Sequence, residues 1–162
     1  CYGSDISKIL LSIRVLDDFG DEKEINAGDI TFCYRGSNLP TNFIILSAKL
    51  KGVVSSKELI EKKQNELIQK KKNSQPRQIK TGGSTFKNHN DKKAWMLIKE
   101  SGCDKFVEGN ARISEKHCNF FVNDGNAKAS DIETLINKVK NKVKSKTGVD
   151  LELEIKIIGN EK

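Results

Sequence analysis

Residues 130–159 read SDIETLINKVKNKVKSKTGVDLELEIKIIG, and this stretch decides the class of fold. In its first part, apolar side chains recur with the period of a helix that has one buried face. These positions are Ile132, Leu135, Ile136, Val139 and Val143. Ser130 and Glu133 have the spacing of a capping box, and Gly148 is placed to end the helix.

The second part of this stretch alternates apolar and polar residues, which predicts a strand. One face of the expected strand carries Leu151, Leu153, Ile155 and Ile157. The other face carries Glu152, Glu154 and Lys156. A helix followed by a strand is typical of the α+β pattern that runs through the whole chain.

Upstream, the chain as far as Lys51 is predicted to be mostly antiparallel sheet with short connections. The strands are expected over 9–17, 23–25, 30–34 and 43–51. The first of them alternates at Ile9, Leu11, Ile13 and Val15, and the last at Ile44, Leu46, Ala48 and Leu50.

Two more helices and a buried strand are predicted. Ser55 and Glu58 form a capping box ahead of a helix that ends before Pro76, and Gly102 stops the second helix. The expected elements are helices over 57–71 and 92–101, a strand over 117–123 and a turn over 123–126. The expected core consists of Trp95, Leu97, Ile98, Phe120, Val122, Leu135, Ile136 and Val139.

Composition limits the classes of function. With 162 residues and 36% hydrophobic content, the chain suits one domain or two small ones with a real core. No stretch approaches the roughly 18 apolar residues of a membrane span, so no membrane partner is predicted. The cysteines lack metal-ligand spacing, which predicts reduced thiols and no metal at Cys1, Cys33, Cys103 and Cys118. His117 precedes Cys118, but neighbours on a strand face opposite ways, which argues against a nucleophile pair.

The net charge of +7 raises the question of a nucleic-acid partner. Its basic residues are overwhelmingly lysines, whereas dedicated readers of nucleic acid favour arginine forks and stacking aromatics. We therefore expect no nucleic-acid partner. A non-catalytic basic α+β module that binds RNA or DNA stays as the alternative function.

A glycine pair opens the segment GGSTFKN at 82–88. Two glycines allow the backbone a positive φ or a close approach to a ligand. A turn of this kind places the Ser84 hydroxyl at the lip of a pocket, with Lys87 and Asn88 available for anionic or polar groups. Taken alone, the segment also suits an ordinary polar loop.

Four motifs together point to a family. They are YRGS at 34–37, QP followed by GGSTFKN within 75–88, SEKHCNFFVNDGNA at 114–127 and LELEIKIIG at 151–159. In this order they resemble the C-terminal part of bacterial UDP-N-acetylenolpyruvoylglucosamine reductases. The family's flavin-binding N-terminal portion lies upstream of Cys1, and the chain does not begin with Met. We therefore expect residues 1–162 alone to bind FAD weakly or not at all, and to be inactive.

The resemblance implies an α+β fold in three parts. Residues 1–71 would be the tail of a vanillyl-alcohol-oxidase-type flavin-binding domain, 72–150 a small α/β substrate-binding domain, and 151–162 a strand returning towards the flavin domain. It also implies a cytoplasmic, monomeric oxidoreductase. This enzyme would use FAD and NADPH to reduce UDP-N-acetylglucosamine enolpyruvate to UDP-N-acetylmuramate for peptidoglycan.

Three catalytic residues are implied by the same resemblance. Ser84 would protonate the substrate carbon after hydride transfer from the reduced flavin. Arg35 would polarise the substrate carboxylate, and Glu154 would act on the same enolate-like intermediate. Alternation alone gives Glu152 and Glu154 the same face and leaves both open.

Further residues are implied to bind ligands. Tyr34, Lys72 and Asn88 match substrate-binding positions, with Lys72 supplying a point charge to the diphosphate. Lys156 stands where the family often has an arginine that contacts the cofactor. A lysine there keeps the charge but loses the bidentate fork, which makes a flavin contact doubtful.

Overall fold

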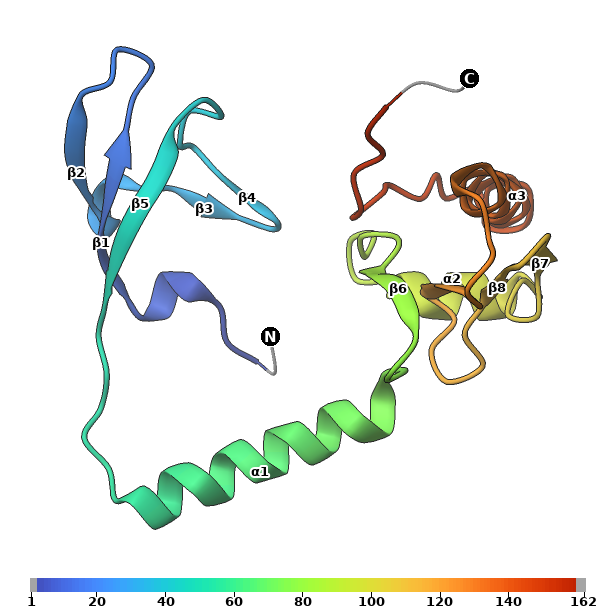
Figure 1. The fold of residues 1–162 in the computed structure, drawn as a ribbon, viewed down its shortest axis with the longest axis horizontal. Helices are drawn as coiled ribbons and strands as arrows, with labels where there is room; N and C mark the ends of the chain where they lie inside the picture. Colours follow the sequence, from blue (N-terminus) through green and yellow to red (C-terminus); the bar gives the residue numbers. More distant parts are fainter. Residues whose placement is uncertain (1–2, 160–162) are drawn as a thin grey trace. The chain divides into compact units, whose positions relative to one another are not determined.

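The structure is a computed structural model that describes residues 3–159. The chain divides into two compact units, Cys1–Leu67 and Ile68–Lys162. The division falls within the long helix α1 (Lys57–Ser74), drawn in green in Figure 1. Each unit has a hydrophobic core of its own.

A three-stranded antiparallel sheet in the order β2-β1-β5 forms most of the first unit. Its strands are β1 (Leu10–Leu16), β2 (Glu22–Asn26) and β5 (Ile44–Leu50). The smaller elements are the turns η1 (Ile6–Lys8) and η2 (Ala27–Asp29) and the hairpin strands β3 (Phe32–Cys33) and β4 (Gly36–Ser37). The antiparallel sheet predicted for this part of the chain is confirmed.

The first strand does not keep the predicted alternation. A β-bulge lies between Leu10 and Ser12 in the pairing of β1 with β5, which makes Leu11 an extra residue in the ladder. Leu11 is consequently 51% exposed, whereas Ile13 and Val15 lie in the core. The apolar face predicted within β5 is exposed along the whole strand.

Four short antiparallel strands form the sheet of the second unit, in the order β6-β9-β8-β7. They are β6 (Lys80–Ser84), β7 (Val107–Glu108), β8 (Ala111–Ile113) and β9 (Phe120–Asn123). Helices α2 (Ala94–Glu100) and α3 (Ala129–Thr147) pack against each other, and α3 also packs against β7 and β8. The sequence pattern does not predict β6, β7 or β8, because each is too short or too rich in glycine to alternate visibly.

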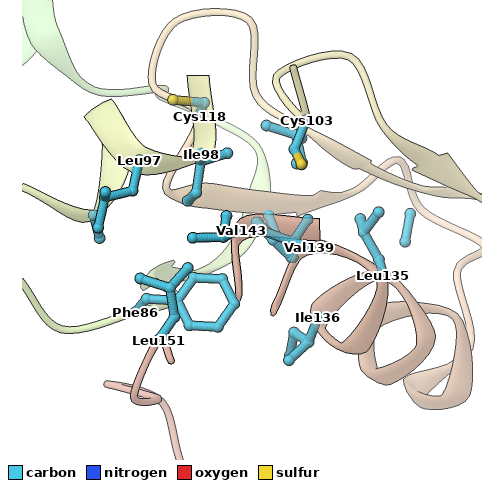
Figure 2. Packing of buried hydrophobic residues seen from close by; sticks show 14 residues of the cluster. Phe86, Leu97, Ile98, Cys103, Cys118, Leu135, Ile136, Val139, Val143 and Leu151 are labelled. Carbon is cyan, nitrogen blue, oxygen red and sulfur yellow. The ribbon is translucent and has the colours of Figure 1, made fainter. Parts of the chain in front are cut away.

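The core of the second unit is formed by α2, α3 and the strands that they cover (Figure 2). Phe86 and Leu151 enter it from outside these elements. Every predicted core residue is buried except Trp95, which is 38% exposed. The buried face of α2 runs through Ala94, Leu97 and Ile98, and Trp95 lies beside that face rather than on it.

Helix α3 ends as predicted but begins differently. Gly148 follows it in the left-handed conformation with φ 74°, which favours glycine. The predicted capping box of Ser130 and Glu133 is wrong. Instead, the Lys128 amide donates to Asp131 Oδ2 at 2.9 Å, because the helix starts one residue before Ser130.

Helix α1 begins at Lys57 as predicted, but its capping residue and its end differ from the prediction. The Leu59 amide donates to the hydroxyl of Ser56 at 3.3 Å, so Ser56 takes the capping position predicted for Ser55 with Glu58. The helix continues to Ser74, three residues beyond the predicted end. It still ends ahead of the proline that disfavours helical conformation in the residue before it.

The predicted terminal strand is wrong. Residues 151–159 contain one isolated antiparallel bridge, between Leu153 and Phe86. Two backbone hydrogen bonds flank this bridge, and beyond it Ile158 is fully exposed. The alternating pattern therefore predicts extended pairing correctly only around Leu153, where the backbone has hydrogen-bond partners. A β-strand forms only where a neighbouring strand supplies the hydrogen bonds.

Candidate active site

Ser84 is the last residue of β6 and pairs with β9. The ladder slips between Thr81 and Ser84, so the glycine pair occupies a distorted part of the strand. Gly83 has φ 88°, and a Cβ on Gly82 would lie 3.3 Å from Ile155 Cγ2. The segment predicted as a loop is thus the bulged end of a strand, with Ser84 half-buried.

Asn119 holds the residues that follow Ser84. The Thr85 amide donates to the Asn119 carbonyl at 2.8 Å. The Asn119 side chain accepts from the Phe86 amide at 3.0 Å and donates to the Phe86 carbonyl at 2.8 Å. Sequence reasoning assigns Asn119 no role. The sequence does contain one indication of a structural role for Asn119, because it is the polar residue in the otherwise apolar run CNFFV at 118–122.

The terminal segment runs along the same residues. The Glu154 amide donates to the Thr85 carbonyl at 2.9 Å, and the Lys87 amide donates to the Glu152 carbonyl at 2.8 Å. The Glu152 carboxylate forms an ion pair with the Lys87 ammonium at the surface, whereas Glu154 is half-buried. Lys156 is exposed. The structure therefore brings the backbone of Glu154 next to the Ser84 segment, and it gives the two glutamates different surroundings.

The predicted substrate-binding residues of the second unit also have structural contacts. The Asn88 Oδ1 accepts from the Ala94 amide at 3.0 Å and so connects the Ser84 segment to the start of α2. Lys72 lies half-buried in the last turn of α1, and its carbonyl accepts from the Lys116 ammonium at 2.6 Å.

A pocket of about 400 Å³ lies near this end of α1. Its lining residues are Ser74, Trp95, Lys99, Asp104, Glu115, Lys116, His117 and Cys118. The His117 ring makes edge-to-face contacts with Trp95 and Phe120, at centroid distances of 6.5 and 4.9 Å. Burial lowers the pKa of His117, which favours the neutral ring.

His117 and Cys118 precede β9 rather than lying on it, so the predicted strand starts too early. They do not form a nucleophile and base. The Cys118 Sγ donates to the Trp95 carbonyl at 2.9 Å, and the His117 Nδ1 accepts from the Asn119 amide at 3.3 Å. Burial raises the pKa of the Cys118 thiol, which disfavours the reactive thiolate.

These surroundings predict the reactivity of the thiols. In a variant carrying Cys1→Ser, a disulfide reagent at neutral pH should modify exposed Cys33 rapidly. Cys103 and Cys118 should react only after unfolding in denaturant, because both are buried and burial raises the pKa of each. Mass spectrometry of labelled peptides measures this. Rapid labelling of Cys118 in the folded protein would contradict the argument.

Tyr34 and Arg35 form the turn between β3 and β4 in the first unit. Arg35 has φ 59°, a conformation that strains a residue with a side chain. Its guanidinium carbon lies 5.5 Å from the centroid of the Tyr34 ring. Both residues border an open groove of about 850 Å³ that residues 4–7 also line. An exposed guanidinium beside a groove suits an anionic ligand.

Within residues 3–159, which the structure describes, no helix is long and apolar enough to cross a membrane. The same residues contain no group of three or more His, Cys, Asp or Glu side chains arranged to hold a metal ion.

Comparison with known proteins agrees with the motifs. Residues 74–158 match the model of the family described as UDP-N-acetylenolpyruvoylglucosamine reductase, C-terminal domain. A reductase of that name from Wolbachia pipientis is 46% identical over 160 residues, which are 98% of this chain and 54% of the relative. The reductase of Pelagibacter ubique is 45% identical over 161 residues, 98% of this chain and 53% of the relative.

A solved structure shows the same similarity. The crystal structure of UDP-N-acetylenolpyruvylglucosamine reductase from Thermus caldophilus matches with a TM-score of 0.79 and 33% identity. The match covers 93% of this chain and 53% of that one. The chain thus spans about half the length of the relatives it matches.

The fold and these matches define an α+β protein that is similar to the C-terminal half of reductases. The chain belongs to the UDP-N-acetylenolpyruvoylglucosamine reductase family, and residues 74–158 match its C-terminal domain. The resemblance of the four sequence motifs is therefore confirmed.

Proposed function

We propose that this chain supplies the substrate-binding and proton-donating part of a reductase that converts UDP-N-acetylglucosamine enolpyruvate to UDP-N-acetylmuramate for peptidoglycan. The position of Ser84 carries the proposal. It ends β6 beside the segment of Glu154, inside the region that matches the family's C-terminal domain. In this proposal, residues 1–71 are the tail of the flavin-binding domain, 72–150 bind substrate, and 151–162 return towards the flavin. The protein is a cytoplasmic monomer.

When bound, FAD reduced by NADPH would supply the hydride. Within this chain, Lys156 stands where the family often has an arginine, and any contact it makes with the cofactor would be that of a point charge. Its exposed ammonium fits an anionic group of a flavin nucleotide, although a point charge binds less selectively than an arginine fork.

Ser84 is proposed to donate a proton to the substrate carbon. A serine hydroxyl is a weak acid in water, so it needs a shielded position and neighbours that stabilise the charge on the intermediate. Ser84 is half-buried, as is Glu154 beside it. Arg35 is proposed to stabilise the negative charge that spreads over the substrate carboxylate, for which a planar cation is suited.

The remaining polar residues are proposed to bind the UDP-sugar. Lys72 would place its ammonium near the diphosphate, Asn88 would offer its amide, and Tyr34 would present its ring and hydroxyl. Asn88 is well placed for this role because its Oδ1 already joins the Ser84 segment to α2. A substrate held by Asn88 would therefore be held by the same short segment that carries the acid.

A chimera tests the proposed function. This chain would be joined to the upstream portion of the Wolbachia pipientis relative, and flavin content and NADPH consumption would be measured. We expect NADPH oxidation that depends on UDP-N-acetylglucosamine enolpyruvate, with UDP-N-acetylmuramate as product. The intact Wolbachia protein is the control. A folded, flavin-loaded chimera that oxidises no NADPH when substrate is added would contradict the proposal.

Substitution of Glu154 and substitution of Glu152 should have different effects on the rate of flavin reoxidation in this chimera. Glu154→Gln should slow substrate-dependent flavin reoxidation by roughly 100-fold, as expected for the loss of a positioned catalytic acid or base. Glu152→Gln is the matched control. Because its carboxylate pairs with Lys87 at the surface, the change should be below about fivefold. Stopped-flow absorbance of the flavin measures both rates. Equal effects of the two substitutions would refute the assignment.

Binding to RNA or DNA distinguishes the proposed reductase from the alternative, a module that binds nucleic acid. Its support is the net charge of +7. We expect only weak association with RNA or DNA, lost steeply as salt rises from about 50 to 200 mM, because phosphate contacts release counterions. Fluorescence anisotropy with several oligonucleotide sequences measures this. A tight, sequence-selective complex at the higher salt concentration would favour the alternative.

A further inference from the structure

The backbone after Ser84 leaves the sheet at a buried place. β6 ends at Ser84, so its ladder with β9 does not continue to Phe86. Phe86 nevertheless lies in the core, packed edge-to-face on Phe121 with ring centroids 5.8 Å apart. Its amide and carbonyl need partners there, because a buried peptide group without a hydrogen-bond partner destabilises the folded state.

The Asn119 side chain supplies both partners. Its Oδ1 accepts from the Phe86 amide at 3.0 Å, and its Nδ2 donates to the Phe86 carbonyl at 2.8 Å. A side-chain amide thus takes the place of a strand's peptide group. On the side of the Phe86 backbone opposite Asn119, the neighbouring residues 85 and 87 form backbone hydrogen bonds with residues 152 and 154 of the terminal segment.

Asn119 is itself held firmly. It is 4% exposed, its carbonyl accepts from the Thr85 amide, and its amide donates to the His117 Nδ1 at 3.3 Å. Four hydrogen bonds therefore converge on one buried residue. Three of them connect it to the two residues that follow Ser84.

We propose that Asn119 is a positioning residue for Ser84. Its side-chain amide forms two hydrogen bonds with the Phe86 peptide, and we call this pair of bonds the Asn119 clamp. The clamp fixes the backbone conformation between Ser84 and Asn88. The same clamp keeps the Thr85 carbonyl where the Glu154 amide reaches it. The inference rests on the proposed function of Ser84, but the clamp itself can be measured without any activity.

Asn123, the last residue of β9, offers a matched control, because Asn119 directly precedes the same strand. Its Oδ1 accepts from the Gly125 and Ala127 amides at 2.7 and 3.0 Å, and its Nδ2 donates to the Ala127 carbonyl at 3.1 Å. It therefore makes a similar set of backbone hydrogen bonds. These bonds hold the turn before α3 rather than the Ser84 segment.

The first experiment measures the clamp by amide hydrogen exchange in the 162-residue chain. Asn119→Ala should speed exchange of the Phe86 amide by about tenfold or more, as expected for the loss of a buried hydrogen bond. Asn119→Asp, which keeps an acceptor but loses the donor, should have a smaller effect. Asn123→Ala should leave the Phe86 amide unchanged. Unchanged exchange at Phe86 in a folded Asn119→Ala protein would overturn the proposal.

The second experiment uses the flavin-loaded chimera. Asn119→Ala should lower the rate of substrate-dependent flavin reoxidation by about tenfold or more while NADPH-driven flavin reduction stays near the unsubstituted rate. Asn123→Ala should change neither rate by more than about twofold. A general loss of folding would lower both rates together. That outcome, or unchanged reoxidation in Asn119→Ala, would overturn the positioning role. An inactive unsubstituted chimera would instead overturn the proposed function and this role with it.

Discussion

Ser84→Ala should slow substrate-dependent flavin reoxidation by at least about 100-fold in the chimera, the lower end of what a positioned general acid contributes. It should leave NADPH-driven flavin reduction nearly intact, because the serine acts only when the substrate carbon receives its proton. Stopped-flow absorbance of the flavin separates the two steps. Ser84→Cys should retain part of the activity, since a thiol also donates a proton.

Ser101→Ala is the matched control for this experiment. Ser101 is buried in the same unit, and within residues 3–159 its hydroxyl has no hydrogen-bond partner. Its removal should therefore leave both flavin steps unchanged. If Ser84→Ala slowed flavin reduction and left reoxidation fast, Ser84 would not be the acid.

Ile136→Ala should lower the free energy of unfolding of the second unit by about 2–5 kcal/mol. Ile136 is 2% exposed and lies where α3 meets the rest of the core (Figure 2). Truncation removes apolar contacts and leaves a cavity in close-packed surroundings. Urea unfolding followed by tryptophan fluorescence measures the loss. Trp95 is the chain's single tryptophan, so the signal reports on this unit alone.

Ile158→Ala removes the same atoms at a position that is 92% exposed. It should change the free energy of unfolding by less than about 0.5 kcal/mol. Comparable losses in the two variants would show that the core does not lie where the structure places it.

Much of the fold follows from local patterns. The spacing of Ile132 to Val143 predicts α3 because one face of a helix of that length must be buried. Gly148 predicts its end because the left-handed conformation favours glycine. Capping side chains are predicted one or two residues away from their true places, since serine, aspartate and asparagine near a helix start compete for the same amides.

For the candidate site, the sequence identifies the residues, and the structure distinguishes between two of them. Family motifs single out Ser84, Arg35 and Glu154, but no local pattern separates Glu154 from Glu152. The structure separates them through Lys87, which is distant in sequence and pairs with Glu152.

By itself, the sequence determined the α+β class, the helices and the family, because helix period, glycine caps and linear motifs are local properties. Only the tertiary structure decided which backbone segments, distant in sequence, form hydrogen bonds with one another. The bulge at Leu11, the failure of residues 151–159 to form a strand and the clamp of Asn119 on Phe86 all depend on partners far away in sequence. A backbone group must find a hydrogen-bond partner when it is buried, and the fold decides which group that is.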